Sequence, residues 1–418
     1  MPKLVLATLG SLGDLHPKIA LALELKSRGH QITIATMEIY RDKIAALGFD
    51  FQPLRPNLDI NDRELTRELL DTRAGPEKLM RGVILPSLPD MYEDLTAAVA
   101  GKDVLITGEI VYAARSVVEK TGIKWITTSL APISLFSAYD LNVYPTAEWI
   151  EYLRPLPAVF HQALFAVMKL TVSHWFEPYR EFRQGLGLDR DHDPVFQGKF
   201  SDLLHLVMFS KAMSPPQPDW PTHSIQTGFC FYDGQEDVGI MPAGLDEFLD
   251  VGEPPIVFTL GSAAVMDARD FFEESAKAAR ILGRRAILLY GIFNSPPTGL
   301  SEDVVAFDYA PFSRLFPHAA CVVHQAGIGT TGQVLRAGVP QLVMPFGHDQ
   351  PDNAARCRRL GVAEIIDRDA YTAEKAAEKL RLILNDTSYR KNAAEVARTV
   401  GTEPGTIAAC DAIEAVLL

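Results

Sequence analysis

The stretch "VVHQAGIGTTGQVL", residues 322–335, joins an apolar strand to a glycine-rich turn and then to the start of a helix. Gly327, Gly329 and Gly332 spell G-x-G-x-x-G, the pattern in which free backbone N–H groups at a helix start hold a diphosphate. The turn predicts a site for either a dinucleotide or a sugar nucleotide. A tight strand-to-helix turn capped by threonine is the alternative that needs no ligand.

The same pattern of a strand followed by glycine occurs near the N-terminus. Thr-Leu-Gly-Ser ends an apolar strand at residues 8–11 and again at 259–262. Uninterrupted apolar runs are typical of strands buried on both faces of a parallel sheet. We therefore predict an α/β protein with two doubly wound Rossmann-like domains that face each other across a cleft. The Pro- and Gly-rich stretch 214–239 is the candidate linker. The expected parts are a first domain 1–233, a second domain 234–400, and a C-terminal helix 401–418.

The composition narrows the classes of function. The 418 residues carry 40 Lys and Arg against 53 Asp and Glu, a net charge of −13, which argues against a nucleic-acid surface and a general attraction to anionic lipid. The four cysteines lie far apart and lack the C-x-x-C spacing of a zinc site. The start does not read as a secretory signal and no apolar stretch has membrane-spanning length, so we expect a cytoplasmic protein.

Two polar features lie beside the glycine loop. His324, at the expected strand end, can donate a hydrogen bond to a phosphate oxygen, a role that the dinucleotide pattern does not contain. Asp349 and Gln350 follow the next strand, where a carboxylate and an amide can together bind vicinal sugar hydroxyls. The alternatives are a structural histidine and a solvated turn or helix cap. Asp349 also lies near the spacing at which a dinucleotide fold places its ribose-binding acid.

These motifs carry a resemblance to a known family. The run "HQAGIGT" (324–330), followed by "AGVPQLVMP" and then "HDQ" (348–350), resembles the donor-site signature of nucleotide-sugar glycosyltransferases of the GT-B fold, the family 1 group of UDP-glycosyltransferases. The resemblance extends over nearly the whole sequence, which looks most like the B subunit of bacterial rhamnosyltransferases and like sterol or lipid glucosyltransferases. The sequence departs from the family where Ala326 replaces a usual glycine and where Gly332 replaces a ribose-binding glutamate.

The resemblance implies that 1–233 binds the acceptor, that 234–400 binds the nucleotide sugar, and that the helix 401–418 packs back on the first domain. It also implies a set of donor-binding residues. In "FDYAPFSRLFPHAACVVHQ" (307–325), an aromatic residue would stack on the nucleobase and the next backbone unit would read the edge of the base. The diphosphate would lie on the glycine loop, and the sugar on the Asp-Gln pair. The implied donor set is Ser262, Tyr309, Ala310, His324, Gly327, Gly329, Thr330, Asp349 and Gln350.

Asp14 follows the first expected strand, in "GSLGDLHP" (10–17). From spacing alone, an aspartate here caps a helix as readily as it acts as a base. In similar enzymes this position holds the His or Asp that removes the proton of the acceptor hydroxyl, which implies that Asp14 is the general base. His16 is a second candidate base. Glu109, after the strand "VLIT", could assist Asp14 or cap the next helix.

We expect the acceptor pocket in the first domain, near an aromatic-rich stretch that includes Phe165 and Trp175. Aromatic residues at helical spacings are also typical of cores. These helices, however, carry apolar residues on more than one face, and the additional face could contact a lipophilic acceptor. The D-x-D motifs at 189–191, 191–193 and 367–369 lie away from both glycine loops. We therefore expect no metal, and no cofactor besides the donor substrate.

The sequence as a whole predicts an inverting, metal-independent hexosyltransferase. It would move a hexose from a UDP- or dTDP-sugar to a hydroxyl of a small lipophilic or lipid-like acceptor. Nucleic acid is not an expected partner, a peripheral membrane contact would suit a lipid-like acceptor, and both a monomer and a homodimer fit the sequence. Two rival hypotheses stay open: an NAD-dependent oxidoreductase that uses residues 327–332 literally, and a non-catalytic partner of another glycosyltransferase.

Overall fold

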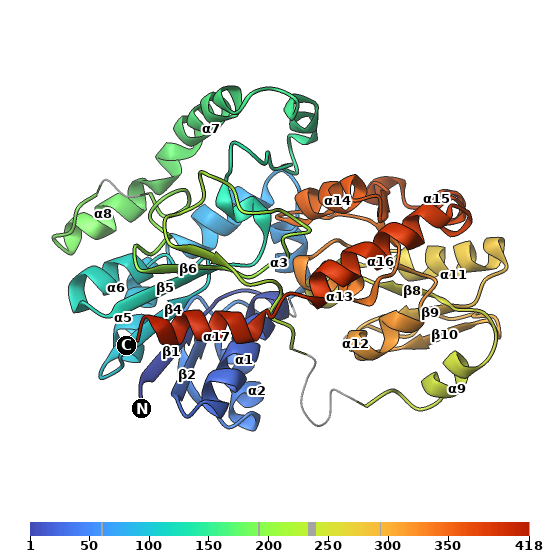
Figure 1. Cartoon of the computed structure of the whole chain (residues 1–418), viewed down its shortest axis with the longest axis horizontal. Helices are drawn as coiled ribbons and strands as arrows, with labels where there is room; N and C mark the ends of the chain where they lie inside the picture. Colours follow the sequence, from blue (N-terminus) through green and yellow to red (C-terminus); the bar gives the residue numbers. More distant parts are fainter. Residues whose placement is uncertain (60–61, 191–192, 233–239, 293, 418) are drawn as a thin grey trace.

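Two parallel sheets, one in each half of the chain, form the framework of the protein (Figure 1). The computed structural model describes residues 1–417 except 60–61, 191–192, 233–239 and 293. The first sheet has seven strands in the order β3-β2-β1-β4-β5-β6-β7, and the second has six in the order β10-β9-β8-β11-β12-β13. Both orders reverse beside the first strand of their half, which is the doubly wound pattern, so the predicted fold class is confirmed.

The strands are short, and most of their residues are buried, as expected for a parallel sheet covered on both faces. The first sheet contains β1 (Lys3–Ala7), β2 (Gln31–Thr36), β3 (Asp50–Pro53), β4 (Val104–Thr107), β5 (Lys124–Ser129), β6 (Leu204–Val207) and β7 (Ser224–Gln226). The second contains β8 (Ile256–Thr259), β9 (Ala286–Leu289), β10 (Val304–Phe307), β11 (Cys321–His324), β12 (Gln341–Val343) and β13 (Ala363–Ile365).

Helices follow most of the strands and cover the sheets (Figure 1). In the first half they are α1 (Leu12–Ser27), α2 (Arg41–Ala46), α3 (Arg63–Leu69), α4 (Gly75–Glu77), α5 (Leu88–Val99), α6 (Ala114–Thr121), α7 (Ala158–Val172) and α8 (Glu177–Gly185). Then follow α9 (Leu245–Asp250), α10 (Gly261–Ala264), α11 (Phe271–Leu282), α12 (Phe312–Leu315), α13 (Ile328–Ala337), α14 (Gln350–Arg359), α15 (Ala373–Asn385), α16 (Thr387–Gly401) and α17 (Thr406–Ala415). Short 3-10 segments run over Glu38–Tyr40, Pro132–Leu135, Glu148–Leu153, Ser173–Phe176, Val265–Asp267, Phe316–His318 and Arg368–Ala370, and a π segment over Lys78–Ile84.

The two helices that start at the glycine loops begin in different ways. The N-cap of α1 is Ser11, whose side chain accepts a hydrogen bond from the Gly13 N–H at 3.2 Å. Helix α13 begins at Ile328, directly after Gly327, whereas the sequence indicates a start near Thr330 or Thr331. The earlier start places the first backbone N–H groups of α13, those of Ile328 and Gly329, inside the glycine loop itself.

The two halves share packed surfaces. Helix α17, at the end of the chain, lies against α1, and Cys410 and Ile413 belong to the core of the first half (Figure 1). Leu70, just after α3, packs into the core of the second half. Within the described residues, no helix combines the length and apolarity needed to cross a membrane.

Candidate active site

The glycine loop of the second half carries a backbone conformation that is unusual for its residues. Ala326 is fully buried and has a φ of 66°, in the left-handed region that favours glycine. Its carbonyl accepts a hydrogen bond from Asn353 Nδ2 at 3.0 Å, and its N–H donates to His324 Nδ1 at 3.1 Å. The left-handed turn therefore exists despite the alanine, because both sides of the residue are held by buried partners.

His324 does not present a ring nitrogen to a ligand in this structure. The ring is fully buried, Nδ1 accepts from the Ala326 N–H, and Nε2 lies 2.8 Å from Gln341 Oε1, to which it donates. Burial lowers the pKa of His324 to about 4, so the ring is neutral at physiological pH. The geometry thus fits a residue that holds the loop, and the direct phosphate contact expected from the sequence would need the ring to leave these partners.

Gln325 is a loop residue that the sequence reasoning did not select. A Cβ atom on Gly261 would lie 2.3 Å from Gln325 Nε2, and one on Gly327 would lie 2.7 Å from it. The two glycine loops of the second half therefore meet across this amide, and a side chain at either glycine would require the Gln325 amide to move. Gln325 Oε1 is buried and has no hydrogen-bond partner in the structure. Its place directly after His324 and two residues before Gly327 is the sequence signal that could have found it.

Gly332 explains one departure from the family pattern. It lies in α13, where a Cβ atom would be 3.1 Å from two atoms of the Phe229 ring. A side chain at this place would press on the Phe229 ring, so a glutamate at residue 332 would require that ring to shift. By contrast, a Cβ atom on Gly329 would have nothing within 4 Å, so that face of the helix start is open.

Asp349 connects the start of α14 to the start of α13. It is the N-cap of α14 and accepts hydrogen bonds from Asn353 Nδ2, at 2.7 Å, and from the backbone N–H of Ile328. Burial raises the pKa of Asp349 to about 6, although these hydrogen bonds oppose the rise. Gln350 is buried, and its Oε1 accepts from the Phe346 N–H at 2.8 Å, which leaves its amide N–H groups available as donors.

The residues expected at the nucleobase, Tyr309 and Ala310, follow β10, while the further donor residue Ser262 follows β8. Tyr309 has an exposed fraction of 43%, as a base-stacking side chain requires, and Ala310 is fully buried beside it. Ser262 is exposed in the short helix α10, directly after Gly261. The predicted roles of these three residues stay predictions.

Asp14 lies in the first turn of α1, at the carboxyl end of β1. Its Oδ2 accepts a hydrogen bond from the Ser11 N–H at 2.9 Å, so it is at once part of a capping box and a candidate base. Burial raises the pKa of Asp14 to about 7, and the charges of Asp349 and Glu109 add to the rise. A carboxylate with this pKa is ionised in part near neutral pH and is a far stronger base than an ordinary aspartate.

Glu109 sits beside Asp14 and is anchored by its own loop. Its carboxylate accepts hydrogen bonds from the Leu130 N–H, at 3.0 Å, and from Ser134 Oγ. Lys199 Nζ lies 3.8 Å from Glu109 Oε2 and is nearly buried. Glu109 does not cap a helix through these contacts; its position instead makes it a neighbour of the candidate base.

Lys18 is a fully buried lysine one turn below Asp14 on α1. Its Nζ donates a hydrogen bond to Thr128 Oγ1, which in turn donates to the carbonyl of Thr107 at 3.0 Å. Burial lowers the pKa of Lys18 to about 8, while the charges of Glu109 and Asp14 favour its protonated form. The sequence reasoning missed this residue because a lysine in an otherwise apolar helix reads as a surface position.

Two other first-half candidates lie in different surroundings. His16 packs against Tyr232 with ring centroids 5.1 Å apart, and burial lowers its pKa to about 4, so it is a weak base. Phe165 packs with Ala138 and Ile150 in a separate apolar cluster of the segment between β5 and α7.

Trp175 contacts the ring of His174 with centroids 6.3 Å apart. No contact in the described residues joins Phe165 or Trp175 to Asp14. The alternative of a packing role therefore fits Phe165.

No group of three or more His, Cys, Asp or Glu side chains among the described residues is arranged to hold a metal ion. The D-x-D motifs at 189–191 and 191–193 fall partly outside the described residues. In the third motif, Asp367 caps a short 3-10 helix and Asp369 pairs with Arg269 at 2.8 Å.

Comparison with known proteins agrees with this arrangement. Residues 4–127 match the glycosyltransferase family 28 N-terminal domain, and residues 295–415 match the erythromycin biosynthesis protein CIII-like C-terminal domain. The chain is 28% identical to O-mycaminosyltylonolide 6-deoxyallosyltransferase of Streptomyces fradiae, over 99% of this chain and 97% of that protein. It is 26% identical to sterol 3-beta-glucosyltransferase UGT80A2 of Arabidopsis thaliana, over 98% of this chain and 65% of that protein.

A solved structure shares the whole architecture. The glycosyltransferase SsfS6 of Streptomyces sp. SF2575, complexed with thymidine diphosphate, aligns with a TM-score of 0.67 at 19% identity, over 99% of each chain. The two sheets, the paired glycine loops and these relatives lead to one conclusion. The chain is a glycosyltransferase of the GT-B fold, with a family 28 type N-terminal domain and an EryCIII-like C-terminal domain.

Proposed function

We propose that this glycosyltransferase transfers a hexose from a dTDP- or UDP-sugar to a hydroxyl of a small lipophilic acceptor, with inversion at the anomeric carbon. The observation that carries the proposal is the meeting of the two halves at the candidate site. Asp14 of the first half and Asp349 of the second are close enough for the charge of Asp349 to contribute to the raised pKa of Asp14, after burial. A base from one half thus faces the sugar-binding pair of the other.

The chemistry needs a base on one side and an anion site on the other. Asp14 takes the proton of the acceptor hydroxyl as its oxygen forms a bond to the anomeric carbon. The bond from that carbon to the diphosphate breaks, and the charge that develops on the diphosphate meets the free N–H groups at the start of α13. Attack and departure on opposite sides give a single displacement with inversion.

Several donor contacts belong to the same proposal. Tyr309 stacks on the base, the Ala310 backbone reads its edge, and Gly327, Gly329 and Thr330 form the diphosphate site, with Ser262 on the neighbouring loop. Asp349 and Gln350 bind the sugar hydroxyls. We assign His324 to the diphosphate site as the residue that holds the loop through Ala326 and Gln341.

The acceptor assignment rests on relatives of known acceptor class. One relative is named an O-mycaminosyltylonolide 6-deoxyallosyltransferase and another a sterol 3-beta-glucosyltransferase, and a sterol is a lipophilic alcohol. Glu109 beside Asp14 is the polar residue that we propose on the acceptor side. The oxidoreductase hypothesis does not account for the similarity of the whole chain to glycosyltransferases.

A calorimetric titration with dTDP, UDP and NAD, with and without EDTA, tests the donor half of the proposal. We expect binding of dTDP or UDP that chelation does not change. The purified chain is then supplied with matching sugar nucleotides and a panel of sterol and macrolide alcohols. Stereochemistry of the product at the anomeric carbon, read by NMR, tests inversion, and retention would refute the single displacement. Transfer by the lone chain excludes the hypothesis of a non-catalytic partner.

A further inference from the structure

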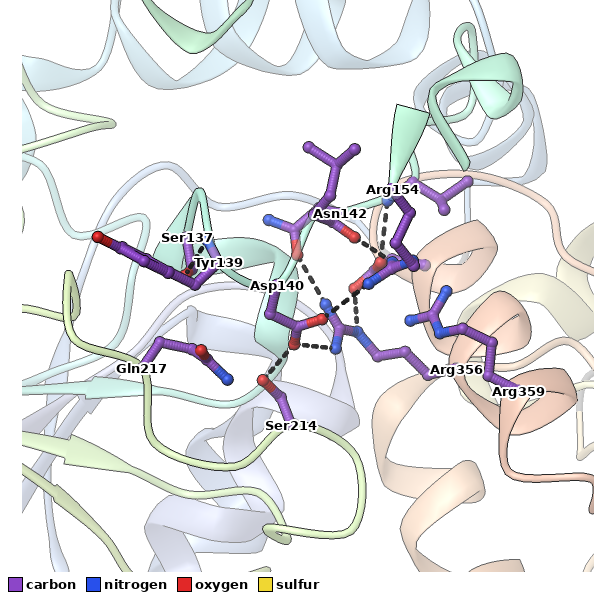
Figure 2. A network of polar contacts seen from close by, with 12 residues as sticks. Ser137, Tyr139, Asp140, Asn142, Arg154, Ser214, Gln217, Arg356 and Arg359 are labelled. Atoms are coloured by element: carbon purple, nitrogen blue, oxygen red, sulfur yellow. Dashed lines mark hydrogen bonds and ion pairs between the residues drawn. The ribbon is translucent and has the colours of Figure 1, made fainter. Parts of the chain in front are cut away.

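A segment of the first half, residues 137–154, lies against helix α14 of the second half (Figure 2). The backbone N–H of Val143 donates to Asp352 Oδ1 at 2.9 Å. Arg356 reaches from α14 to the carboxylate of Asp140 and, at 2.9 Å, to Asn142 Oδ1. These contacts join two parts of the chain that are more than 200 residues apart in sequence.

The guanidinium of Arg356 is a buried charge with each of its nitrogens in use. Its side chain has an exposed fraction of 2%, and Nε donates to the fully buried Asp352 at 2.7 Å. Nη1 donates to Asp140 and to the carbonyl of Met213, the latter at 3.1 Å, and Nη2 donates to Asn142. Because a buried charge without partners is costly, this geometry favours one arrangement of the two halves over displaced ones.

Asp140 is shared between the two halves. It accepts hydrogen bonds from Arg356, from Ser214 Oγ, and from Arg154 Nη1 at 3.0 Å, as Figure 2 shows. The loop that holds Asp140 is thus also held by contacts within its own half, from Arg154 and Ser214. A movement of α14 relative to the first half would break a network rather than a single pair.

The same helix begins with the sugar-binding pair. Asp349 is the N-cap of α14 and Gln350 its first residue, while Asp352 and Arg356 follow within the next two turns. Asn353 Nδ2 donates both to Asp349 Oδ2, at 2.7 Å, and to the Ala326 carbonyl of the glycine loop, at 3.0 Å. One face of α14 is therefore tied to the donor loop, and Arg356 ties it to the acceptor-binding half.

We infer that Arg356 is a positioning residue for sugar transfer, which holds Asp349 and Gln350 in register with Asp14 by anchoring α14 to residues 140–143. The inference rests on the proposed function of the site. Arg356 itself is buried against Asp140, Asn142 and Asp352, so it acts through the helix and not through contact with the donor. In a reaction between groups on two halves, a displacement of about 1 Å can cost about 100-fold in rate.

The inference predicts a specific kinetic signature. The proposed nucleotide contacts, at Tyr309, Ala310 and the start of α13, lie within the second half and do not involve Arg356. Loss of the anchor should therefore lower kcat while nucleoside diphosphate affinity stays the same. A residue with a purely stabilising role would instead lower the melting temperature and leave kcat per folded molecule unchanged.

The test compares Arg356→Met, Asp140→Asn and Arg356→Lys with the control Arg358→Met. Asp140→Asn keeps the shape of the loop and leaves Arg356 paired with Asp352, so it should fold even where Arg356→Met does not. Arg358 lies on the exposed side of the same helix. For each protein, one measures kcat, the Kd for dTDP and UDP by calorimetry, and hydrogen exchange of residues 137–143.

We expect Asp140→Asn and Arg356→Met to lose about 10- to 100-fold in kcat, with Kd within about twofold of the parent and faster exchange at 137–143. Arg356→Lys should recover part of the rate, since it restores the charge but not the fork, and Arg358→Met should match the parent.

Parent-like kcat in Asp140→Asn and in folded Arg356→Met overturns the inference, as does an equal loss of kcat and nucleotide affinity. A parent that binds neither dTDP nor UDP refutes the proposed function and this inference with it. A parent that transfers sugar while its anchor variants do so equally well refutes the inference alone.

Discussion

Asp14, at the start of the first helix, and Asp349, at the start of α14, are carboxylates from opposite halves of the chain that meet at one site. Burial and then the nearby charge of Asp349 raise the pKa of Asp14, and burial also raises that of Asp349. Two buried carboxylates that share a site have higher pKa values than ordinary surface acids, because burial and the like charge both disfavour ionisation. Because the two carboxylates come from different halves, the pKa of Asp14 depends on how the halves are assembled, and a pH profile of the rate can measure it.

Asp14→Asn should remove transfer and leave donor binding intact. Asparagine keeps the oxygen that accepts from the Ser11 N–H, so α1 should begin as before. Without a base, kcat should fall by roughly 100- to 10,000-fold. Calorimetry with dTDP or UDP is the control, since its Kd should not change. Transfer at the parent rate would show that another group takes the proton.

The rate of transfer should rise with pH through neutrality. Asp14 must be ionised to act as a base, and its pKa is about 7. Below this pH the protonated form dominates, so at pH 5 the rate should be about 1% of its plateau. A profile of kcat against pH with a donor that is saturating throughout provides the measurement. A midpoint near 4 would mean that burial does not perturb Asp14 in the working enzyme.

Lys18→Met should move the acidic limb of that profile to higher pH. The charges of Lys18 and Asp14 favour each other, so removal of the buried ammonium should raise the pKa of Asp14 further. Thr128 keeps its hydrogen bond to the Thr107 carbonyl in either protein. The control is Lys26→Met on the exposed part of α1, which should leave the profile unchanged. An unchanged limb in Lys18→Met would remove Lys18 from the electrostatics of the site.

His324→Ala should weaken both the fold and nucleotide binding. The substitution leaves the buried Gln341 without its partner, at a cost of about 1–3 kcal/mol in the free energy of unfolding, and it releases the Ala326 N–H. Gln341→Leu is the matched variant, because it removes the same hydrogen bond and leaves the ring. Equal losses of dTDP affinity in the two variants indicate that His324 acts by holding the loop. A much larger loss in His324→Ala would indicate a direct contact with phosphate.

Gly332→Glu should lose stability, whereas Gly329→Glu should lose nucleotide binding. A side chain at 332 meets the Phe229 ring, so the variant should lose more than about 2 kcal/mol in the free energy of unfolding. A side chain at 329 meets open space, so stability should hold, while its negative charge at the start of α13 repels the diphosphate. Urea denaturation and calorimetry separate the two outcomes. A stable Gly332→Glu protein with tighter nucleotide binding would show that the glutamate is accommodated.

The parts of this fold that can be read from the sequence are local. The strands that end at Thr-Leu-Gly-Ser and the turn after His324 are specified by neighbouring residues, because buried parallel strands and glycine turns leave short, regular patterns. The sequence pattern places the start of α13 two or three residues too late, because the helix begins at Ile328, soon after the left-handed turn at Ala326. That turn depends on buried partners of Ala326, which a local sequence pattern does not show.

The parts that could not be read depend on contacts between distant segments. The inward turn of the His324 ring follows from Gln341, a residue of the neighbouring strand β12, and the surroundings of Phe165 follow from the chain at 138–150. The network around Arg356 joins positions that no local pattern relates. The roles of Asp14 and of the donor residues stay predictions until they are measured.

The path of the last helix has a consequence for synthesis of the chain. Proteins generally fold domain by domain from the N-terminus while the ribosome is still at work. Here α17, which follows the whole second half in the chain, supplies Ala409, Cys410 and Ile413 to the core of the first half, and Asp411 and Glu414 pair with Arg28 of α1. The domain that is translated first is therefore completed only after the second domain has been made, and the helix that carries Asp14 gains this support late.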